Sequence, residues 1–123
     1  KGMKERKYGR ILNISSIWSI VSKEKRSIYS ASKSGLDGLT KTLALELAPF
    51  DILVNSIAPG YVDTKMIQLY NSEKDLEKIK KIIPLGRFAK PNEIGELAKF
   101  MCSEKNSYIT GQIIPIDGGY ITQ

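Results

Sequence analysis

Short apolar runs alternate with longer amphipathic stretches along this chain. The run RILNIS at 10–15 is rich in β-forming residues and predicts a buried strand. Two further strands are predicted at 51–59 (DILVNSIAP) and at 111–117 (GQIIPID). The 51–59 run is almost continuously apolar, which is typical of a strand in a parallel sheet that is covered on both faces.

Two longer helices are predicted between these strands. The stretch 27–48 carries one apolar stripe at spacings of three and four residues, formed by Leu36, Leu39, Leu43 and Leu47. The stretch 91–104 predicts the second helix, with Pro91 near its first turn. Residues 60–82 indicate a loop followed by one or two short helices. The resulting order of strands and helices predicts two βαβ crossovers and an α/β fold with three parallel strands, the first of which has an unpaired outer edge.

The composition is that of an ordinary globular protein. The 123 residues, 41% hydrophobic and 26% charged, suffice for one domain at most. No apolar run approaches the roughly 18 residues of a membrane span, and the charged stretch 1–10 does not resemble a signal peptide. The single cysteine, Cys102, forbids an internal disulfide and fits a reducing compartment. We therefore expect a cytoplasmic protein without a membrane partner, in which Cys102 is a small packing residue.

Charge and missing residue types exclude several functions. The net charge of +6 is spread along the chain without interleaved aromatic residues, so we expect solvated faces and no nucleic-acid partner. The chain has no histidine and one cysteine, which excludes a Ser-His-Asp triad, a Cys-His dyad and a zinc site built on these residues. No metal is expected.

A tyrosine and a lysine lie one turn apart at the start of the 27–48 helix. Tyr29 and Lys33 are four residues apart, so their side chains face the same way and can share one pocket. A permanent positive charge beside a phenol favours the phenolate, and such a tyrosine can exchange a proton with an alcohol or an alkoxide. Ser16 follows the first strand, where parallel α/β sheets hold their ligands, and is the candidate to hold the substrate oxygen. Tyrosine–lysine pairs at this spacing also occur by chance.

Five motifs in order carry a resemblance to a known family. They are GRILNISS (9–16), YSASKSG (29–35), LALELAPFDILVNSIAPGYVDT (43–64), PLGRFAKPNEI (84–94) and YITGQIIPIDGG (108–119). Together they resemble the short-chain dehydrogenase/reductases, particularly the branch that includes the 3-oxoacyl-acyl-carrier-protein reductases. The resemblance covers essentially the whole chain. It implies the C-terminal half of a Rossmann-like, doubly wound parallel sheet, and an NAD(P)-dependent enzyme that interconverts ketones and secondary alcohols.

The resemblance also implies roles for the catalytic candidates. Ser16 would stabilise the substrate carbonyl oxygen, and Tyr29 would be the proton donor or acceptor. Lys33 would favour the ionised tyrosine and would hydrogen-bond the nicotinamide ribose. Trp18 would offer a ring on which a hydrophobic substrate could stack, or would pack against the lid. Ser19 replaces a glycine that is usual in the family, which suggests a bulkier pocket wall.

The turn at 59–64 is implied to lie against the nicotinamide of NAD or NADP. Pro59 and Gly60 would allow close approach, the Val62 backbone would meet the carboxamide, and Thr64 would lie near the phosphates or the amide. The segment 65–83 corresponds to the family's substrate-covering lid, although an ordinary surface helical hairpin explains its pattern as well.

Members of the family are about twice as long as this chain. The half that is missing here carries the glycine-rich turn for the pyrophosphate and the residue that selects NAD or NADP. We therefore expect the sequence to record part of a longer protein, a fragment, or a split or decayed gene product. The family assembles as dimers or tetramers, so the alternative function is an inactive half-domain that only oligomerises with or complements other subunits.

Overall fold

The computed structural model describes all residues, 1–123, and contains one sheet of three parallel strands. Strands β1 (Gly9–Ile14), β2 (Ile52–Pro59) and β3 (Ile113–Ile116) lie side by side in that order. In the register, Gly9 lies opposite Ile52 and Ser56 lies opposite Ile113. The three predicted strands are thus confirmed within two residues at each end, and β1 pairs only with β2, as expected of a strand with an open outer edge.

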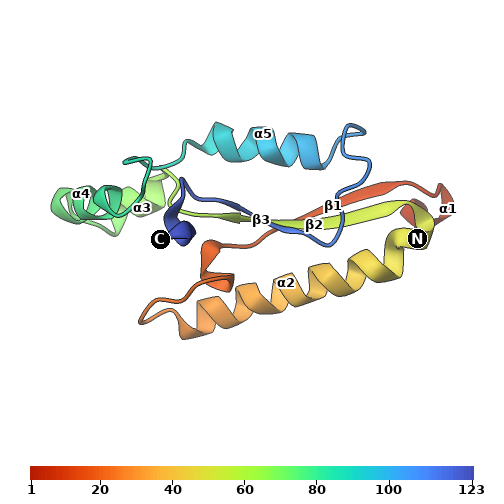
Figure 1. Cartoon of the computed structure of the whole chain (residues 1–123), viewed down its shortest axis with the longest axis horizontal. Coiled ribbons are helices and arrows are strands. Elements are labelled where there is room, and N and C mark those ends of the chain that lie inside the picture. Colours follow the sequence, from red (N-terminus) through yellow and green to blue (C-terminus); the bar gives the residue numbers. More distant parts are fainter.

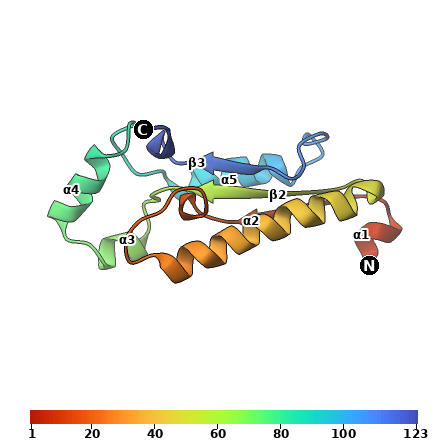
Figure 2. The same ribbon diagram turned by 60° about the horizontal axis from the view of Figure 1, so that its bottom comes forward.

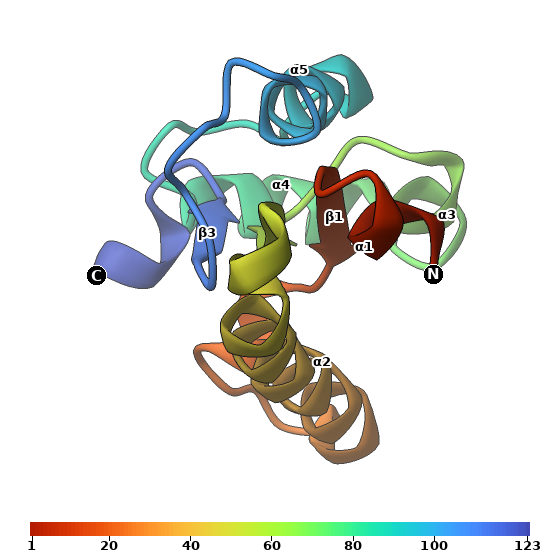
Figure 3. The same ribbon diagram turned by 90° about the vertical axis from the view of Figure 1, so that its right-hand side faces the viewer.

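Helices cover both faces of the sheet (Figure 1). Helix α2 (Ser27–Leu47) lies along one face and α5 (Pro91–Met101) along the other. Figure 3, which looks along the strands, shows the sheet between these two helices. The predicted α/β architecture, three parallel strands with flanking helices, is therefore confirmed.

Shorter elements complete the chain. Helix α1 (Gly2–Glu5) precedes β1. Helices α3 (Lys65–Leu69) and α4 (Glu73–Lys81) lie beyond the carboxyl ends of the strands (Figure 2). Three 3₁₀ turns connect elements: η1 (Ile17–Ser19), η2 (Ala48–Phe50) and η3 (Tyr120–Thr122). No helix is long and apolar enough to cross a membrane.

The face of α2 that meets the sheet matches the predicted leucine stripe at Leu43 and Leu47, which pack against the core, but not at Leu39. Asp37, Thr40 and Ala44 are buried there, whereas half of the Leu39 surface is exposed, so the prediction for Leu39 was wrong. The buried polar groups have partners on the strands. Ser56 Oγ donates to Asp37 Oδ1 at 3.2 Å, and a strand asparagine donates to Thr40 Oγ1 at 2.8 Å. Hydrogen bonds to the strands, rather than leucine packing alone, orient this helix.

A buried asparagine on β2 fixes the segment that leads into β3. Asn55 Nδ2 donates to the Ile109 carbonyl at 2.7 Å, and its Oδ1 accepts from the Gln112 N–H at 3.0 Å. Asn55 is almost fully buried, so each of its contacts replaces a hydrogen bond to water. The third strand is thereby held in register with the second.

Helix α5 ends earlier than predicted. It stops at Met101, which is buried, and Cys102 follows it as an exposed residue. The prediction that Cys102 is a packing residue was therefore wrong. Because the helix ends at Met101, the position of Cys102 is no longer set by the amphipathic pattern of α5.

Candidate active site

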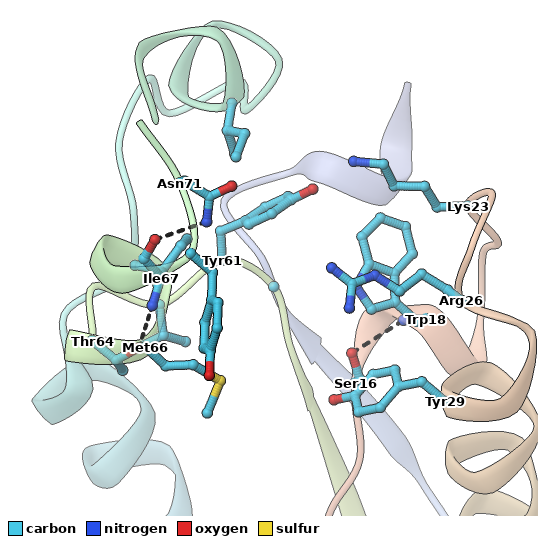
Figure 4. A pocket seen from close by; sticks show the side chains of 14 residues that line it. Ser16, Trp18, Lys23, Arg26, Tyr29, Tyr61, Thr64, Met66, Ile67 and Asn71 are labelled. Atoms are coloured by element: carbon cyan, nitrogen blue, oxygen red, sulfur yellow. Dashed lines mark hydrogen bonds between the residues drawn. The ribbon is translucent and has the colours of Figure 1, made fainter. Parts of the chain in front are cut away.

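A pocket of about 560 Å³ lies at the carboxyl ends of the strands (Figure 4). Its walls come from three parts of the chain: the segment 16–29, the turn 60–64, and the α3–α4 region from 66 to 79. Parallel α/β sheets hold their ligands at this edge because the loops that leave the strands gather there. The pocket is therefore where the sequence predicted the chemistry to lie.

Ser16 lies two residues beyond β1 and is almost fully buried. Its Oγ caps η1 by accepting a hydrogen bond from the Trp18 N–H at 3.3 Å. Because the oxygen is used here as an acceptor, the serine proton remains free to be donated to another oxygen. Ser16 lines the pocket, so that other oxygen can belong to a bound molecule.

Ser19 does not form the bulkier pocket wall that the sequence suggested. Its hydroxyl donates to the Ser16 carbonyl at 2.7 Å and accepts from the Ser15 hydroxyl at 3.3 Å. Ser19 does not line the pocket. The residue thus stabilises the turn that carries Ser16, and its effect on the pocket is indirect.

Tyr29 is in the first turn of α2 and lines the same pocket as Ser16. The residue is 42% exposed, so part of it is open to solvent. Figure 4 shows Ser16 and Tyr29 next to each other on one wall. The two side chains therefore lie close together in the structure, as the sequence predicted.

Lys33 lies one turn further along α2, outside the pocket wall. Its Nζ is 5.7 Å from the centroid of the Tyr29 ring and donates to the Ile14 carbonyl at 2.8 Å. An ammonium group has three N–H donors, so two remain for another partner. Lys33 thus lies beside Tyr29 with two N–H donors that are not used within the protein.

The turn after β2 contributes Gly60, Val62 and Thr64 to the pocket, while Pro59 ends the strand without lining it. A Cβ on Gly60 would come within 2.8 Å of the Asp117 Cβ. The close neighbour that requires glycine here is therefore a residue of this chain, whereas the sequence suggested a cofactor.

Neither backbone polar group of Val62 has a hydrogen-bond partner within the protein. The Asp63 N–H donates to the Ala89 carbonyl at 2.8 Å, and the Ala89 N–H donates to the Tyr61 carbonyl at 2.9 Å. These bonds lie on either side of Val62, a residue that lines the pocket, and leave both its N–H and its carbonyl free. A carboxamide, which both donates and accepts, matches this pair.

Thr64 caps α3 with its side chain. Its Oγ1 accepts from the Ile67 N–H at 3.5 Å, which leaves the hydroxyl proton available. Thr64 and Val62 thus line the pocket with hydrogen-bonding groups that no protein partner uses, while Lys33 lies behind the Tyr29 wall. The glycine-rich turn that would hold a pyrophosphate is not among residues 1–123.

Three aromatic rings from distant parts of the chain, those of Trp18, Tyr61 and Tyr120, pack together in what we call the aromatic wall; Trp18 and Tyr61 line the pocket, and Tyr120 lies behind them. The ring centroids of Trp18 and Tyr61 are 6.2 Å apart, those of Trp18 and Tyr120 5.9 Å, and those of Tyr61 and Tyr120 5.6 Å. All three contacts are edge-to-face, which is a favoured geometry for aromatic pairs. Trp18 thus packs on two tyrosines, a role distinct from the lid contact that the sequence offered as an alternative to substrate stacking.

Burial raises the pKa of Tyr61 to about 12, and the neighbouring Tyr120 adds to the rise. The phenol of Tyr61 therefore stays protonated near neutral pH.

Sequence reasoning missed both tyrosines of the aromatic wall. Tyr61 lies inside the PGYVDT turn, so its neighbours along the chain were a usable signal, whereas nothing local indicated that Tyr120 would join it.

Two cations in the pocket were also missed. Lys23 and Arg26, from the segment before α2, line the pocket with Ser16 and Tyr29. On the opposite side, helices α3 and α4 contribute apolar residues that include Met66, Ile67 and Ile79. The segment 65–83 thus borders the pocket, while its motion as a lid stays a prediction. No group of three or more His, Cys, Asp or Glu side chains is arranged to hold a metal ion.

Comparisons with known proteins agree with this geometry. A family model described as enoyl-(acyl carrier protein) reductase matches residues 1–121. The 3-oxoacyl-[acyl-carrier-protein] reductase FabG of Aquifex aeolicus is 46% identical over 117 residues, which are 95% of this chain and 47% of that protein. FabG of Thermotoga maritima is 44% identical over 119 residues, 97% of this chain and 48% of that protein.

Among solved structures, a gluconate 5-dehydrogenase from Burkholderia cenocepacia in complex with NADP and tartrate is similar, with a TM-score of 0.92 at 29% identity. The match covers 99% of this chain and 48% of that one. The chain spans about half the length of the curated relatives it matches. The motifs, the parallel sheet and these matches together show that the chain belongs to the short-chain dehydrogenase/reductase family, within the group described as enoyl-(acyl carrier protein) reductases.

Proposed function

We propose that this chain supplies the catalytic side chains of an NAD(P)-dependent oxidoreductase that interconverts a ketone and a secondary alcohol. The observation that carries the proposal is that Ser16 and Tyr29 line one pocket at the strand ends, with Lys33 one helical turn from Tyr29. The substrate is a small carbonyl compound or alcohol. A cytoplasmic location, which the single cysteine suggested, belongs to the same proposal.

The reduction follows from the hydrogen-bonding states of these side chains. A nicotinamide cofactor, when bound, supplies the hydride to the carbonyl carbon. Ser16 donates its free hydroxyl proton as a hydrogen bond to the carbonyl oxygen, on which negative charge develops. Tyr29 transfers its phenolic proton to that oxygen, which completes the alcohol, and the positive charge of Lys33 stabilises the phenolate that remains. Oxidation of the alcohol runs through the same steps in reverse.

The nicotinamide end of the cofactor has specific partners in this proposal. The two unused donors of Lys33 would hold the ribose hydroxyls, the free N–H and carbonyl of Val62 would hold the carboxamide, and Thr64 would donate nearby. Tyr29 and Gly60, which line the pocket, would complete this contact surface, and Pro59, which does not line the pocket, would set the course of the turn. The gluconate 5-dehydrogenase that resembles this chain binds NADP. We propose NAD or NADP for this chain, since the residue that selects between them belongs to the part of the family's domain that this chain does not span.

The remainder of the cofactor site must come from further polypeptide, either of the same protein or of a second chain. A second candidate function follows from this requirement: an inactive module that assembles with other subunits. The exposed apolar side chains of α2 favour it, since Ile28 is 86% exposed and Leu45 is 80% exposed. The same surface fits a dimer or tetramer of the active enzyme, so assembly alone does not distinguish the two functions.

A chimera tests the proposal. The part of Aquifex aeolicus FabG that this chain does not match is fused in front of residues 1–123, and oxidation of NADPH and NADH is followed with a 3-oxoacyl thioester. We expect cofactor-dependent reduction that is lost in Tyr29→Phe. A chimera that is folded and binds NADPH, yet reduces no ketone, would contradict the proposed oxidoreductase activity. The inactive assembly module would then be the remaining candidate function.

A further inference from the structure

Two positive side chains share the pocket with the catalytic candidates. Lys23 and Arg26 lie in the segment between η1 and α2, and Figure 4 shows both reaching into the space above Trp18 and Ser16. Arg26 directly precedes α2, three residues before Tyr29. A group held by Arg26 would therefore be close to the point where the carbonyl is expected to bind.

No acidic group of the protein neutralises these cations. Neither side chain forms a salt bridge or a hydrogen bond, although Glu24 lies between them in the sequence. No Asp or Glu lines the pocket. Asp63 is the acidic residue within the pocket-lining turn, and its carboxylate accepts a hydrogen bond from Gln68 Nε2 at 2.9 Å. Two unpaired cations in a concave site attract an anion from solution.

The field of Arg26 also reaches the far side of the pocket. Burial raises the pKa of Tyr61, and the charge of Arg26 acts on the same phenol in the opposite direction. Arg26 is exposed and lines the pocket, so its guanidinium is accessible to a ligand that enters from solvent. A guanidinium can bind a carboxylate or a phosphate through two parallel hydrogen bonds, and a nearby ammonium adds a point charge.

The rest of the pocket is suited to an uncharged body. The aromatic wall contributes the rings of Trp18 and Tyr61, and α3 and α4 face it with Met66, Ile67 and Ile79. A substrate would place its ketone at Ser16 and Tyr29 and its apolar part between these side chains. A second polar group of that substrate would lie near Lys23 and Arg26.

We propose that Lys23 and Arg26 form an anion subsite, so that the ketone taken by this pocket carries a carboxylate or a phosphate. This inference rests on the proposed function, because it names the substrate class of the same site. Both anions share the chemistry that Arg26 recognises, an oxyanion with two oxygens in reach of the guanidinium fork. Neutral ketones of equal size are expected to bind less tightly.

Trp18 provides a direct measurement, because it is the single tryptophan of the chain and lines the pocket. Its fluorescence is titrated with two matched pairs: levulinate against methyl levulinate, and dihydroxyacetone phosphate against dihydroxyacetone. We expect a saturable change with one or both anions and at least about tenfold weaker binding of the neutral partner, since hydrogen bonds to charged groups are the stronger ones. The pair that shows the larger difference identifies carboxylate or phosphate as the source.

Substitutions connect the effect to the two cations. Arg26→Gln and Lys23→Gln are expected to bring the anion's affinity down to that of its neutral partner. The matched controls are Arg6→Gln, directly after α1 at the opposite end of the sheet, and Lys99→Gln, exposed on α5. Equal binding of acid and ester, no response to any of the four probes, or equal losses in the control variants would overturn the subsite.

The same titrations are made on the Aquifex chimera, which keeps the test open if residues 1–123 do not fold alone. Turnover separates this inference from the proposed function. A chimera that reduces charged and neutral ketones with equal kcat/KM keeps the enzyme and overturns the anion subsite. A chimera whose Trp18 responds to anions but which reduces no ketone keeps the subsite and contradicts the enzyme.

Discussion

The ammonium of Lys33 donates a hydrogen bond of 2.8 Å to the main-chain carbonyl of Ile14. Ile14 is the last residue of β1, so a side chain of α2 is tied to the strand that leads into Ser16. The strand end and the helix start are thus joined where the candidate catalytic residues meet.

Replacing Lys33 by methionine should reduce both cofactor affinity and turnover in the chimera. The variant removes the bond to Ile14 and the donors proposed for the ribose. Hydrogen bonds to charged groups contribute about 1.5–3 kcal/mol, which corresponds to a loss of at least about tenfold in NADPH affinity. The change in affinity is measured by titrating the protein with NADPH and following the cofactor's fluorescence. Lys41→Met, an exposed position on the same helix, should change neither quantity; unchanged affinity in Lys33→Met would refute the ribose contact.

Tyr29→Phe should reduce turnover without reducing cofactor affinity. Loss of the phenolic proton removes general acid catalysis, so kcat should fall by about 10²–10⁴-fold while NADPH affinity stays within about twofold. Steady-state assays of ketone reduction give kcat, and titration with NADPH gives the cofactor affinity. Tyr108→Phe, at a tyrosine that is 95% exposed, is the control. Retention of most of the turnover would sink the proposed role of Tyr29.

Gly60→Ala should destabilise the protein. The added methyl group would lie 2.8 Å from Asp117 Cβ and 2.9 Å from its Cα, and a main-chain neighbour cannot turn aside. Overpacking of this kind costs about 1–3 kcal/mol of unfolding free energy. Gly35→Ala is the matched control, because its Cβ meets nothing within 4 Å and helical alanine is about 0.5–1 kcal/mol better than glycine. Urea unfolding curves of both variants should shift in opposite directions.

The ion pair at the start of α5 should make stability depend on pH. Hydrogen bonds from Arg87 at 2.7 and 2.8 Å lower the pKa of Glu93 from 4.5 to about 2, and the Lys90 N–H contributes as well. The folded state therefore holds the proton less tightly than the unfolded state. The stabilisation is fully present above the ordinary pKa of 4.5 and is lost as the pH falls from there toward 2.

Glu93→Gln tests that dependence. The difference in thermal midpoint between the native protein and this variant should be constant near neutral pH and should shrink as the pH falls through that window. Glu96→Gln, on the same helix but outside any salt bridge, should show no such trend. A difference that grows on acidification would mean that the sign of the Glu93 contribution is wrong.

The strands and helices were predictable because their signals are local. The β2 run is apolar at almost every position, and Ile52 through Ala58 are all buried in the structure. The prediction for α2 was right for Leu43 and Leu47, which pack against the core, and wrong for Leu39, because counting leucines ignored the hydrogen bonds that bury Asp37 and Thr40 against the sheet. A hydrophobic pattern predicts which apolar side chains are buried, but it does not predict which polar side chains are buried with hydrogen-bond partners.

The candidate site was predictable only in part, for a similar reason. Ser16 and Tyr29 follow from their places at a strand end and a helix start, positions that one sequence reveals. The positions of Lys23 and Arg26 depend on how the intervening loop folds back, and that path has no periodic signal. Charges counted as solvated faces therefore turned out to line the pocket.

The aromatic wall has a consequence for how substrate range can change. Trp18, Tyr61 and Tyr120 touch one another in all three pairs, so a smaller ring at one position frees space that the other two rings can move into. Residues in mutual contact give non-additive effects when they are substituted together. In laboratory evolution, new specificity at this pocket should accordingly arise from combinations drawn from positions 18, 61 and 120, and libraries that vary one position at a time will pass over them.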